Sequence, residues 1–296
     1  MSKNKKKIQF ALVFCSFVLP SFILYSFFVV YPLVNTVSIS FFRWNIRRDI
    51  LNFVGFQNYI DMFTNDPAFI QSIIFTVRYA VIMIVLLNVV ALLLAASIES
   101  GIRGRNVVRN MFFIPNVMSG IIVAFVWRFM FMALYPEMIT FLRLPESWDV
   151  SWFATGDMAF YAIIIVAFWQ GLGFNIILYI AGLQMVPSDL YESAEIDGAS
   201  AFQRLTRITI PMIAPTITIN LFVSINGTFR LFDIPMGLTG GGPMRMTESL
   251  ALNIYMTAFD LNELGAASAR SVFLLVLVLI CASIQIYFTS KREVSL

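Results

Sequence analysis

Six long apolar stretches, separated by shorter polar segments, constrain the fold of this chain more than any other feature. They run roughly over residues 8–34, 72–98, 110–134, 158–183, 210–232 and 271–289. Each reaches the length of about 20 residues that a helix needs to cross a bilayer. With 59% apolar residues, 12% charged residues and a mean hydropathy of +0.82, the chain has too little polar surface for a soluble globule. Because the period-2 pattern of barrel strands is absent, the sequence predicts an all-α integral membrane protein with six transmembrane helices.

The distribution of basic residues predicts the orientation of these helices. The first stretch begins with lysines, but its apolar part exceeds the roughly 7 to 15 residues of a cleaved signal peptide, so we expect a retained helix. Six helices place both termini on one side, which collects 11 of the 20 basic residues. These are Lys3, Lys5, Lys6, Lys7, Arg103, Arg105, Arg109, Arg204, Arg207, Lys291 and Arg292. The loops of the opposite side hold Arg43, Arg47, Arg48, Arg143 and Arg245. The positive-inside rule therefore places both termini in the cytoplasm of a cell-membrane protein.

The residues that most enzymes need are missing. The chain has no histidine, and no cysteine or acidic cluster has the spacing of a metal site, so we expect no metal and no catalytic residues. The glycine-rich run Gly240–Pro243 lacks the Gly-Lys-Ser/Thr ending of a phosphate-binding loop. Cys15 and Cys281 fall in predicted spans as small packing residues, and a net charge of +3 does not suggest nucleic acid. The chain should not hydrolyse ATP by itself.

The polar segment between the fourth and fifth stretches predicts two short helices that meet at a glycine. Asp189 with Glu192 has the spacing of a capping-box variant, and Gly198 can adopt the left-handed conformation that ends a helix. Ser200 with Gln203 forms a second capping box before the fifth span.

The first of these short helices carries an acidic ridge. Asp189, Glu192 and Glu195 recur every third residue beside the small side chains of Ser193 and Ala194. Small residues allow a partner to approach closely, and the carboxylates favour a basic receptor. From the pattern alone, a docking helix and a solvated amphipathic loop are both open.

The spacing Glu192-x-Ala194-x-x-x-Gly198, nine residues, Ile208-x-Ile210-Pro211 resembles the signature loop of type I ABC importer permeases. Ser193 replaces the usual middle alanine and Ile210 the usual leucine. Further segments are similar to the carbohydrate-uptake branch of that family. They are Tyr191, Ile196–Ala199, Ile208–Met212, Phe53–Tyr59, Phe229–Asp233, Leu238–Pro243, Thr247, Glu248 and Tyr255.

The resemblance implies the organisation and partners of the chain. Residues 1–70 would form a first transmembrane helix and an external segment, 71–290 an ABC transporter type-1 transmembrane domain, and 291–296 a cytoplasmic tail. The partners would be a second homologous permease in a heterodimer, a cytoplasmic ATPase dimer that binds the ATP, and an external solute-binding protein that delivers a sugar or oligosaccharide. No cofactor of the chain's own is expected. The residues implied in ATPase coupling are Glu192, Ser193, Ala194, Asp197 and Gly198.

Polar residues inside the spans are candidates for the substrate pathway, because such residues are costly in lipid. In the fifth span, one helical face carries Thr216, Asn220, Ser224, Gly227 and Thr228. The fourth span adds Gln170, Gly171 and Asn175, with Trp169 and Phe174 as stacking surfaces, and the third adds Asn116 and Ser119 near a kink at Pro115. Hydrogen bonding between helices explains the same polar residues equally simply, so both interpretations stay open.

Two arginines and one amphipathic segment belong at the outer boundary. Arg128 and Arg230 each lie about 28 to 30 Å from the inner end of their spans at 1.5 Å per residue. We expect both side chains to snorkel to the interface, or Arg230 to form an ion pair with Asp233. The segment 246–266 is expected to be an external or re-entrant helix.

Three other functions were weighed. They are an autonomous secondary transporter or channel, an ABC permease for a non-sugar solute, and an intramembrane enzyme. No Asp or Glu lies deep in a predicted span, which disfavours a carboxylate proton relay.

Overall fold

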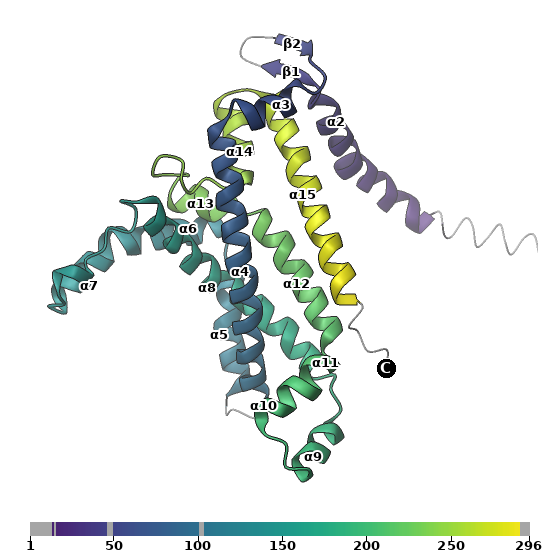
Figure 1. The fold of residues 1–296 in the computed structure, drawn as a ribbon, viewed down its shortest axis with the longest axis vertical. Coiled ribbons are helices and arrows are strands. Elements are labelled where there is room, and N and C mark those ends of the chain that lie inside the picture. Colours follow the sequence, from purple (N-terminus) through teal and green to yellow (C-terminus); the bar gives the residue numbers. More distant parts are fainter. Residues whose placement is uncertain (1–13, 15, 46–49, 101–103, 291–296) are drawn as a thin grey trace, which may run out of the picture. The chain divides into compact units, whose positions relative to one another are not determined.

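The computed structural model describes residues 14, 16–45, 50–100 and 104–290 (Figure 1). Predictions that involve the start of the first span, residues 8–13, and the tail 291–296 lie outside the described residues. So do those on Lys3, Lys5, Lys6, Lys7, Cys15, Arg47, Arg48, Arg103, Lys291 and Arg292. The chain divides into two compact units. Unit 1 holds the described residues up to Asn65 together with Ile254–Phe273, and unit 2 holds Asp66–Asn253 together with the described residues from Leu274 onward.

Unit 1 contains the first candidate span and a small β-hairpin. Its elements are a π-helical turn η1 (Ser26–Val30), α2 (Tyr31–Ile39), β1 (Phe42–Asn45), β2 (Ile50–Phe53), α3 (Gln57–Thr64) and a second π-helical turn η5 (Met256–Asp260). The strands pair antiparallel with Phe42 opposite Phe53. The buried Asn58 amide donates to the Ser40 and Phe42 carbonyl oxygens at 2.8 and 2.9 Å, which ties α3 to the hairpin. The sequence did not predict this hairpin.

Unit 2 is a helical bundle that contains the longest helices. Its elements are α4 (Pro67–Glu99), α5 (Arg105–Val117), α6 (Gly120–Phe129), a π-helical turn η2 (Met130–Leu134), α7 (Tyr135–Phe141), a 3-10 turn η3 (Glu146–Trp148), α8 (Gly156–Leu183), α9 (Ser188–Ile196), α10 (Ala201–Arg204), a π-helical turn η4 (Leu205–Thr209), α11 (Ile210–Met212), α12 (Ala214–Phe229) and α13 (Asp233–Leu238). Two further helices, α14 (Leu250–Tyr255) and α15 (Leu264–Ser290), have residues in both units. Within unit 2, α8 packs against α4, α5 and α12, and α13 packs against α6 (Figure 1).

The two longest helices of unit 2 begin at side-chain caps. Asp66 accepts hydrogen bonds from the Ala68 and Phe69 amides at 3.0 and 3.1 Å, and Pro67 follows at the first helical position of α4. Thr155 accepts from the Met158 amide at 3.3 Å and starts α8. Both caps are local in sequence, which is why the starts of α4 and α8 lie close to the predicted starts of the second and fourth spans.

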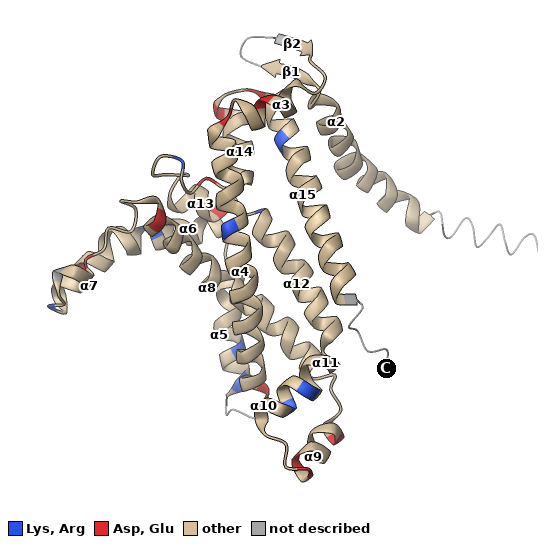
Figure 2. Cartoon of the chain, in the orientation of Figure 1, with Lys and Arg blue, Asp and Glu red and all other residues tan. Residues whose placement is uncertain are grey.

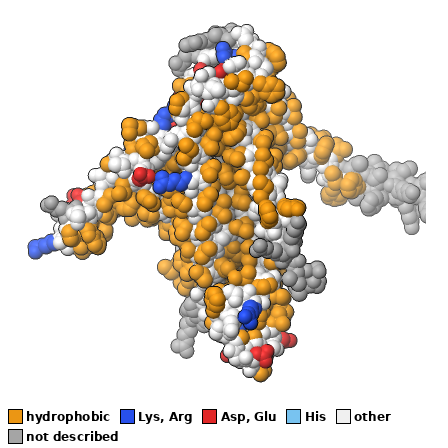
Figure 3. Space-filling view, in the orientation of Figure 1, with side chains coloured by type: hydrophobic (Ala, Val, Ile, Leu, Met, Phe, Trp, Pro, Cys, Tyr) orange, Lys and Arg blue, Asp and Glu red, His pale blue; other side chains and the backbone are white. Residues whose placement is uncertain are grey.

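Helix α4 is apolar on both its inner and its outer face. Met83 and Ala91 are 1% and 0% exposed and face the core. Val81, Val85 and Val89, on the other face, are 60%, 57% and 52% exposed. A helix that is hydrophobic all round suits a bilayer, where the outer face meets lipid. Figure 3 shows hydrophobic side chains over the visible face of α4 and its neighbours in unit 2, with charge over α9 and α10.

The predicted fold class is confirmed, with two corrections to individual spans. Among the described residues, five helices are long and apolar enough to cross a membrane, or six if the bent pair Ala201–Met212 and Ala214–Leu238 is one span. The third span was predicted as one helix over 110–134 with a kink at Pro115, but the helix ends there, because Met118 has an extended ψ of 145°. The fifth, predicted as continuous over 210–232, bends by 75° at Ile213. Proline explains both corrections, because Pro115 and Pro215 each remove a backbone donor near the break.

Candidate functional site

The helix that carries the acidic ridge, α9, begins two residues earlier than an N-cap at Asp189 would place it. Pro187 precedes it with an extended ψ of 133°, and Ser188 is its first residue. Asp189 therefore lies in the first turn and is not the N-cap, so the predicted capping role of Asp189 is wrong. Its carboxylate still lies where the helix dipole favours a negative charge.

The bend after α9 forms as predicted. Gly198 has a φ of +75°, and its amide and the Ala199 amide donate to the Glu195 and Ala194 carbonyl oxygens at 3.0 and 2.9 Å. This pair of bonds is a complete Schellman motif. The next helix starts with the predicted capping box, in which the Ser200 amide donates to Gln203 Oε1 at 2.8 Å and the Gln203 amide donates to Ser200 Oγ at 3.3 Å. A helix, a left-handed bend and a second helix therefore stand between α8 and α12.

The implied coupling residues differ in exposure. Glu192, Ser193, Asp197 and Gly198 are exposed, whereas Ala194 is 8% exposed and packs against its own chain. The acidic residues thus form the open face of α9, and the small side chain of Ala194 serves the packing of the loop. Figure 2 shows charged residues gathered on α9, α10 and the start of α5, while the body of α12 carries none.

Four polar side chains form a buried hydrogen-bond network between α4, α8 and α12. Asn175 Nδ2 donates to the Gly171 carbonyl at 2.8 Å, which leaves Asn175 Oδ1 to accept from Ser224 Oγ at 3.1 Å. Asn88 Nδ2 donates to Ser224 Oγ at 3.1 Å, and Tyr179 donates its hydroxyl to Asn88 Oδ1 at 2.8 Å. Asn175 and Ser224, predicted as pathway residues, therefore hold three helices together in this structure.

The rest of the predicted polar stripe of α12 divides into buried and open positions. Asn220 is 0% exposed, and neither of its amide atoms has a hydrogen-bond partner among the described residues. Thr228 is 4% exposed and donates to the Ser224 carbonyl of its own helix at 2.8 Å. Gly227 is exposed, with no described atom within 4 Å of the position where a Cβ would lie.

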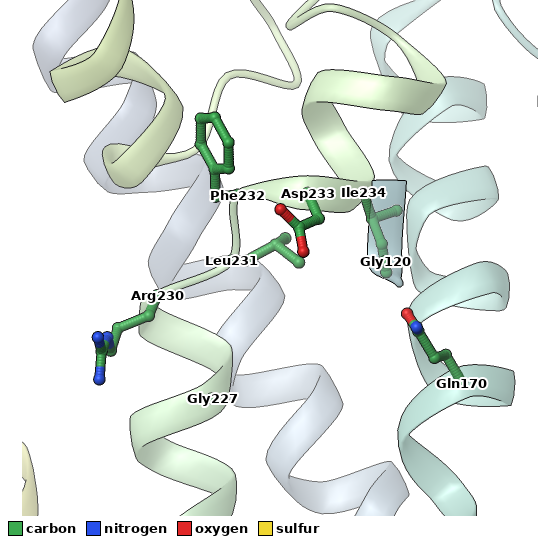
Figure 4. Close-up of a pocket in the computed structure, with 8 residues that line it drawn as sticks. All are labelled: Gly120, Gln170, Gly227, Arg230, Leu231, Phe232, Asp233 and Ile234. Carbon is green, nitrogen blue, oxygen red and sulfur yellow. The ribbon is translucent and has the colours of Figure 1, made fainter. Parts of the chain in front are cut away.

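A pocket of about 290 Å³ lies beside Gly227, between α6, α8, α12 and α13 (Figure 4). It is lined by Gly120, Gln170, Gly227, Arg230, Leu231, Phe232, Asp233 and Ile234. Gln170 and Gly227 are the two predicted pathway residues that line it. The close-up shows the carboxylate of Asp233 and the amide of Gln170 directed toward the same space. The pocket thus combines apolar walls with an amide and a carboxylate.

The expected ion pair between Arg230 and Asp233 is wrong for this structure. The Arg230 side chain points away from Asp233 (Figure 4). Helix α12 ends at Phe229, and Phe232 has a φ of −130° before α13 begins at Asp233. The chain turns between the two residues, so the helical spacing on which the prediction relied is absent. Asp233 instead packs against Gly120, where a Cβ would lie 2.8 Å from the Asp233 Cβ.

The remaining pathway candidates lie around the break between α5 and α6. Gln170 Nε2 donates to the Met118 carbonyl at 3.0 Å, and Asn116 Nδ2 donates to the Gln170 carbonyl at 3.5 Å. Ser119 is exposed at the start of α6. Gly171 faces Leu87, and a Cβ added to Gly171 would lie 3.6 Å from the Leu87 side chain. These contacts hold the freed backbone of the third span against α8, next to the pocket.

Sequence reasoning missed two members of the buried network, Asn88 and Tyr179. Asn88 stands within a long apolar run, and a solitary amide at such a depth is costly unless it is bonded. That isolation was a signal for Asn88. Tyr179 gave none, because a tyrosine among apolar residues also fits simple packing.

A buried carboxylate anchors the segment that follows the glycine-rich loop. Glu248 is 0% exposed and accepts hydrogen bonds from Arg245 Nε and Nη2 at 2.5 and 2.8 Å and from Asn253 Nδ2 at 2.8 Å. The bond to Glu248 raises the pKa of the Arg245 guanidinium, against the opposing effect of its partial burial. A buried charge of this kind requires such partners. The Thr247 hydroxyl donates to the Gly242 carbonyl at 2.6 Å, which ties the loop over Gly240–Pro243 to this segment.

Comparison with known proteins gives concordant matches. Residues 88–293 match the family described as binding-protein-dependent transport system inner membrane component. The chain is 34% identical over 297 residues to the probable starch degradation products transport system permease protein AmyD of Thermoanaerobacterium thermosulfurigenes, with 100% of both chains covered. It is 32% identical over 279 residues to the multiple sugar-binding transport system permease protein MsmF of Streptococcus mutans, with 94% of this chain and 96% of that protein covered.

A third relative and a solved structure complete the comparison. The sn-glycerol-3-phosphate transport system permease protein UgpA of Brucella suis is 32% identical over 276 residues, with coverage of 92% and 93%. The fold matches a chain in the crystal structure of a bacterial ABC transporter involved in the import of the acidic polysaccharide alginate, with a TM-score of 0.83 at 22% identity. That match covers 98% of this chain and 99% of the other.

Proposed function

The chain belongs to the family of binding-protein-dependent transport system inner membrane components, and on this basis we propose that it is the permease subunit of an ATP-driven importer for a neutral sugar or short oligosaccharide. Members of this family are transport components, so the chain is a membrane transporter subunit and not an enzyme. The proposed substrate rests on the pocket together with the sugars named for two relatives, starch degradation products and multiple sugars.

The pocket is the observation that carries the proposal. Its 290 Å³ can receive part of a sugar, and it lies on helices of the membrane-spanning bundle. The Gln170 amide and the Asp233 carboxylate supply donors and acceptors for hydroxyl groups, and Leu231 and Ile234 supply apolar contacts. Sugar sites combine such apolar surface with a few directed polar groups. Gly227 lines the pocket, and the space beside it is empty, so a larger side chain at this position would occupy that space.

The charge of the pocket favours a neutral solute over an anion such as the glycerol phosphate named for another relative. Asp233 contributes a carboxylate to the pocket lining, and the guanidinium of Arg230, which also lines the pocket, is directed away from that carboxylate and does not neutralise it (Figure 4). A negative group placed there would meet the Asp233 carboxylate in a site partly shielded from water, where like charges repel strongly. A neutral polyhydroxylated solute avoids this repulsion.

The proposed importer is completed by partner proteins. The exposed acidic face of α9, with Glu192, Ser193 and Asp197, is the proposed dock for a cytoplasmic ATPase dimer that binds the ATP, so the chain needs no cofactor of its own. Gly198 sets the angle between α9 and α10. The second wall of the pathway would come from a homologous permease subunit, and an external solute-binding protein would deliver the sugar.

The proposed orientation puts both termini and the loop of α9 and α10 in the cytoplasm. Its support is the positive-inside rule applied to the basic residues. Among the described ones, Arg105 and Arg109 belong to α5, Arg204 to α10 and Arg207 to η4. Figure 2 shows the basic residues of α5 and α10 at the same end of unit 2.

Transport by the purified complex in proteoliposomes tests the proposal. The complex that copurifies with the tagged chain is reconstituted with ATP on the side of α9 and is offered labelled maltose, maltotriose, raffinose and sn-glycerol-3-phosphate. We expect ATP-dependent uptake of at least one neutral sugar and none of the phosphate ester. Replacement Gly227→Phe, which fills the pocket, should abolish uptake without loss of assembly.

Two outcomes would contradict the proposal. Uphill accumulation of solute by the chain alone, driven by an ion gradient, would indicate an autonomous secondary transporter. ATP-dependent uptake of sn-glycerol-3-phosphate in preference to the sugars would indicate a permease for a non-sugar solute.

A further inference from the structure

A single side-chain hydrogen bond connects α9 to the turn that leads into the fifth span. The Tyr191 hydroxyl on α9 lies 3.0 Å from Thr209 Oγ1 at the end of η4. Thr209 is 4% exposed and Tyr191 is partly buried, so water competes little for this bond. The two residues are 18 positions apart, on opposite sides of the bend at Gly198.

The direction of this bond follows from the other bond that Thr209 makes. Thr209 Oγ1 donates its proton to the Arg204 carbonyl at 3.2 Å. A threonine hydroxyl has one proton and two lone pairs. Tyr191 is therefore the donor and Thr209 the acceptor, and removal of the Tyr191 hydroxyl leaves the bond from Thr209 to Arg204 intact.

The other side-chain link across the bend is weaker. Glu195 Oε2 lies 3.6 Å from Arg204 Nη1, and the Glu195 side chain is 76% exposed. Exposed ion pairs at such distances contribute little because water and salt screen them. The bend itself stands free, since no described atom lies within 4 Å of a Cβ built at Gly198. Among the described side chains, the pair Tyr191 and Thr209 is thus the shielded connection between α9 and the chain beyond the bend.

The turn that ends at Thr209 leads through α11 and α12 to the pocket. The amide of Ile210 donates to the Leu205 carbonyl in the wide π-helical pattern, and α11 follows from Ile210. The chain bends at Ile213 into α12, whose last turns carry Gly227 at the pocket. Inserted π-helical turns often occur at functional positions of helices. A force applied at Thr209 acts at the base of the helix that lines the pocket.

Building on the proposed function, we propose that Tyr191 is a positioning residue for coupling. Its hydroxyl ties α9 to Thr209, so that a displacement of α9 by the docked ATPase moves α11 and α12. Without this bond, the same displacement is absorbed by rotation about Gly198. Tyr191 contacts neither nucleotide nor solute in this proposal, and it acts through Thr209.

The test uses the whole complex that copurifies with the chain and a reporter at the pocket. Cys15 and Cys281 are replaced by alanine, and Gly227→Cys is introduced, a position with room for the new side chain. The rate of modification of this cysteine by N-ethylmaleimide is measured with and without ATP. In a parallel background, Glu192→Cys is crosslinked to the ATPase to monitor docking.

We expect Tyr191→Phe to keep the crosslink and ATP hydrolysis but to reduce the ATP-induced change in labelling about fivefold to tenfold, as loss of one shielded hydrogen bond permits. Thr209→Val removes this bond together with the one to the Arg204 carbonyl, so its response should fall at least as far, and the double variant should be no worse than Thr209→Val. Thr209→Ser, which keeps the hydroxyl, should restore the response. Tyr135→Phe, which removes a hydroxyl bonded to the Trp148 carbonyl, is the matched control and should have no effect.

The possible failures are distinguishable. A full ATP response in Tyr191→Phe with a normal crosslink overturns this inference alone. Loss of the crosslink in Tyr191→Phe also overturns it, because the hydroxyl would then support the fold of α9. A parent complex that gives neither crosslink nor ATP response overturns the proposed docking and this inference with it.

Discussion

The loop of α9 and α10 and the buried network of α4, α8 and α12 are stabilised in opposite ways. In the loop, the bonds of the Schellman motif and of the capping box join residues three to five positions apart. In the network, the bonds join residues 49, 91 and 136 positions apart, and their members are all buried. The loop is shaped by local sequence in contact with water, whereas the network exists only after three helices have packed.

The two regions therefore differ in how they respond to the loss of a hydrogen bond. A bond in the exposed loop is replaced by water when it is lost, so its loss is mild unless the backbone itself is strained. A bond in the network leaves a polar group in a dry interior, where it has no alternative partner. Substitutions in the two regions should therefore differ in both the size and the kind of their effect.

Replacement Asn88→Leu should have the largest effect on stability. It removes the acceptor of the Tyr179 hydroxyl and the donor to Ser224 Oγ together. We expect the free energy of unfolding to fall by about 2 kcal/mol, since a buried polar group left without a partner costs about 1 to 3 kcal/mol. Unfolding of the purified chain in detergent, followed by circular dichroism, measures this.

The matched control for this variant is Asn226→Leu. The Asn226 amide donates to the Phe222 carbonyl of its own helix, outside the network. The Asn226→Leu variant should change the unfolding free energy by less than about 0.5 kcal/mol, because water or lipid headgroups can replace a peripheral hydrogen bond. Equal losses in the two variants would show that the network is not special.

Replacement Gly198→Val should have the next largest effect, and on function more than on stability. The φ of +75° costs a residue with a Cβ roughly 1 to 2 kcal/mol, although space is available around the position. We expect the bend to open and uptake per ATP hydrolysed to fall severalfold in the reconstituted complex. Gly198→Asn should be milder because asparagine tolerates this conformation. Wild-type uptake by a normally assembled Gly198→Val complex would refute the role of the bend.

The same contrast explains how much of the structure the sequence could predict. Gly198 and the pair Ser200 and Gln203 were predictable because their partners lie within one turn. The apolar stretches that become spans were predictable because their length and hydropathy need no tertiary information, whereas the breaks in the third and fifth stretches were not placed. The N-cap of α9 was predicted at Asp189, but it is Pro187. A proline is also common at the start of a helix, and local sequence does not decide between the two positions.

The candidate site was only partly predictable for a related reason. The helical face of α12 correctly grouped Asn220, Ser224 and Thr228, but a helical pattern cannot state whether the face meets a pathway or another helix. The structure places these three in the packed interior and leaves Gly227 at the pocket. Asp233 was read only as a partner of Arg230, because the turn between them is invisible in the spacing.

Replacement Asn220→Leu should raise the free energy of unfolding, whereas replacements in the buried network should lower it. Asn220 is 0% exposed, and within the described structure both its amide atoms lack hydrogen-bond partners. A leucine of similar size removes this desolvated amide, so we expect the unfolding free energy to rise by about 1 kcal/mol. Thermal unfolding of Asn220→Leu beside Asn175→Leu, which breaks a bond and should lower stability, measures the difference. A loss of stability in Asn220→Leu would mean that its amide has a partner in the membrane.

Replacement Glu195→Gln should have the smallest effect, and it sharpens the comparison most. Its carboxylate lies 3.6 Å from the Arg204 guanidinium with the side chain 76% exposed, so the unfolding free energy should change by less than about 0.3 kcal/mol. If so, backbone-directed bonds shape the loop, and its surface charges remain available for a partner. Unfolding measured at low and at high salt checks this. A loss above about 1 kcal/mol that vanishes in high salt would mean that charge pairing, and not the bend at Gly198, fixes the angle between α9 and α10.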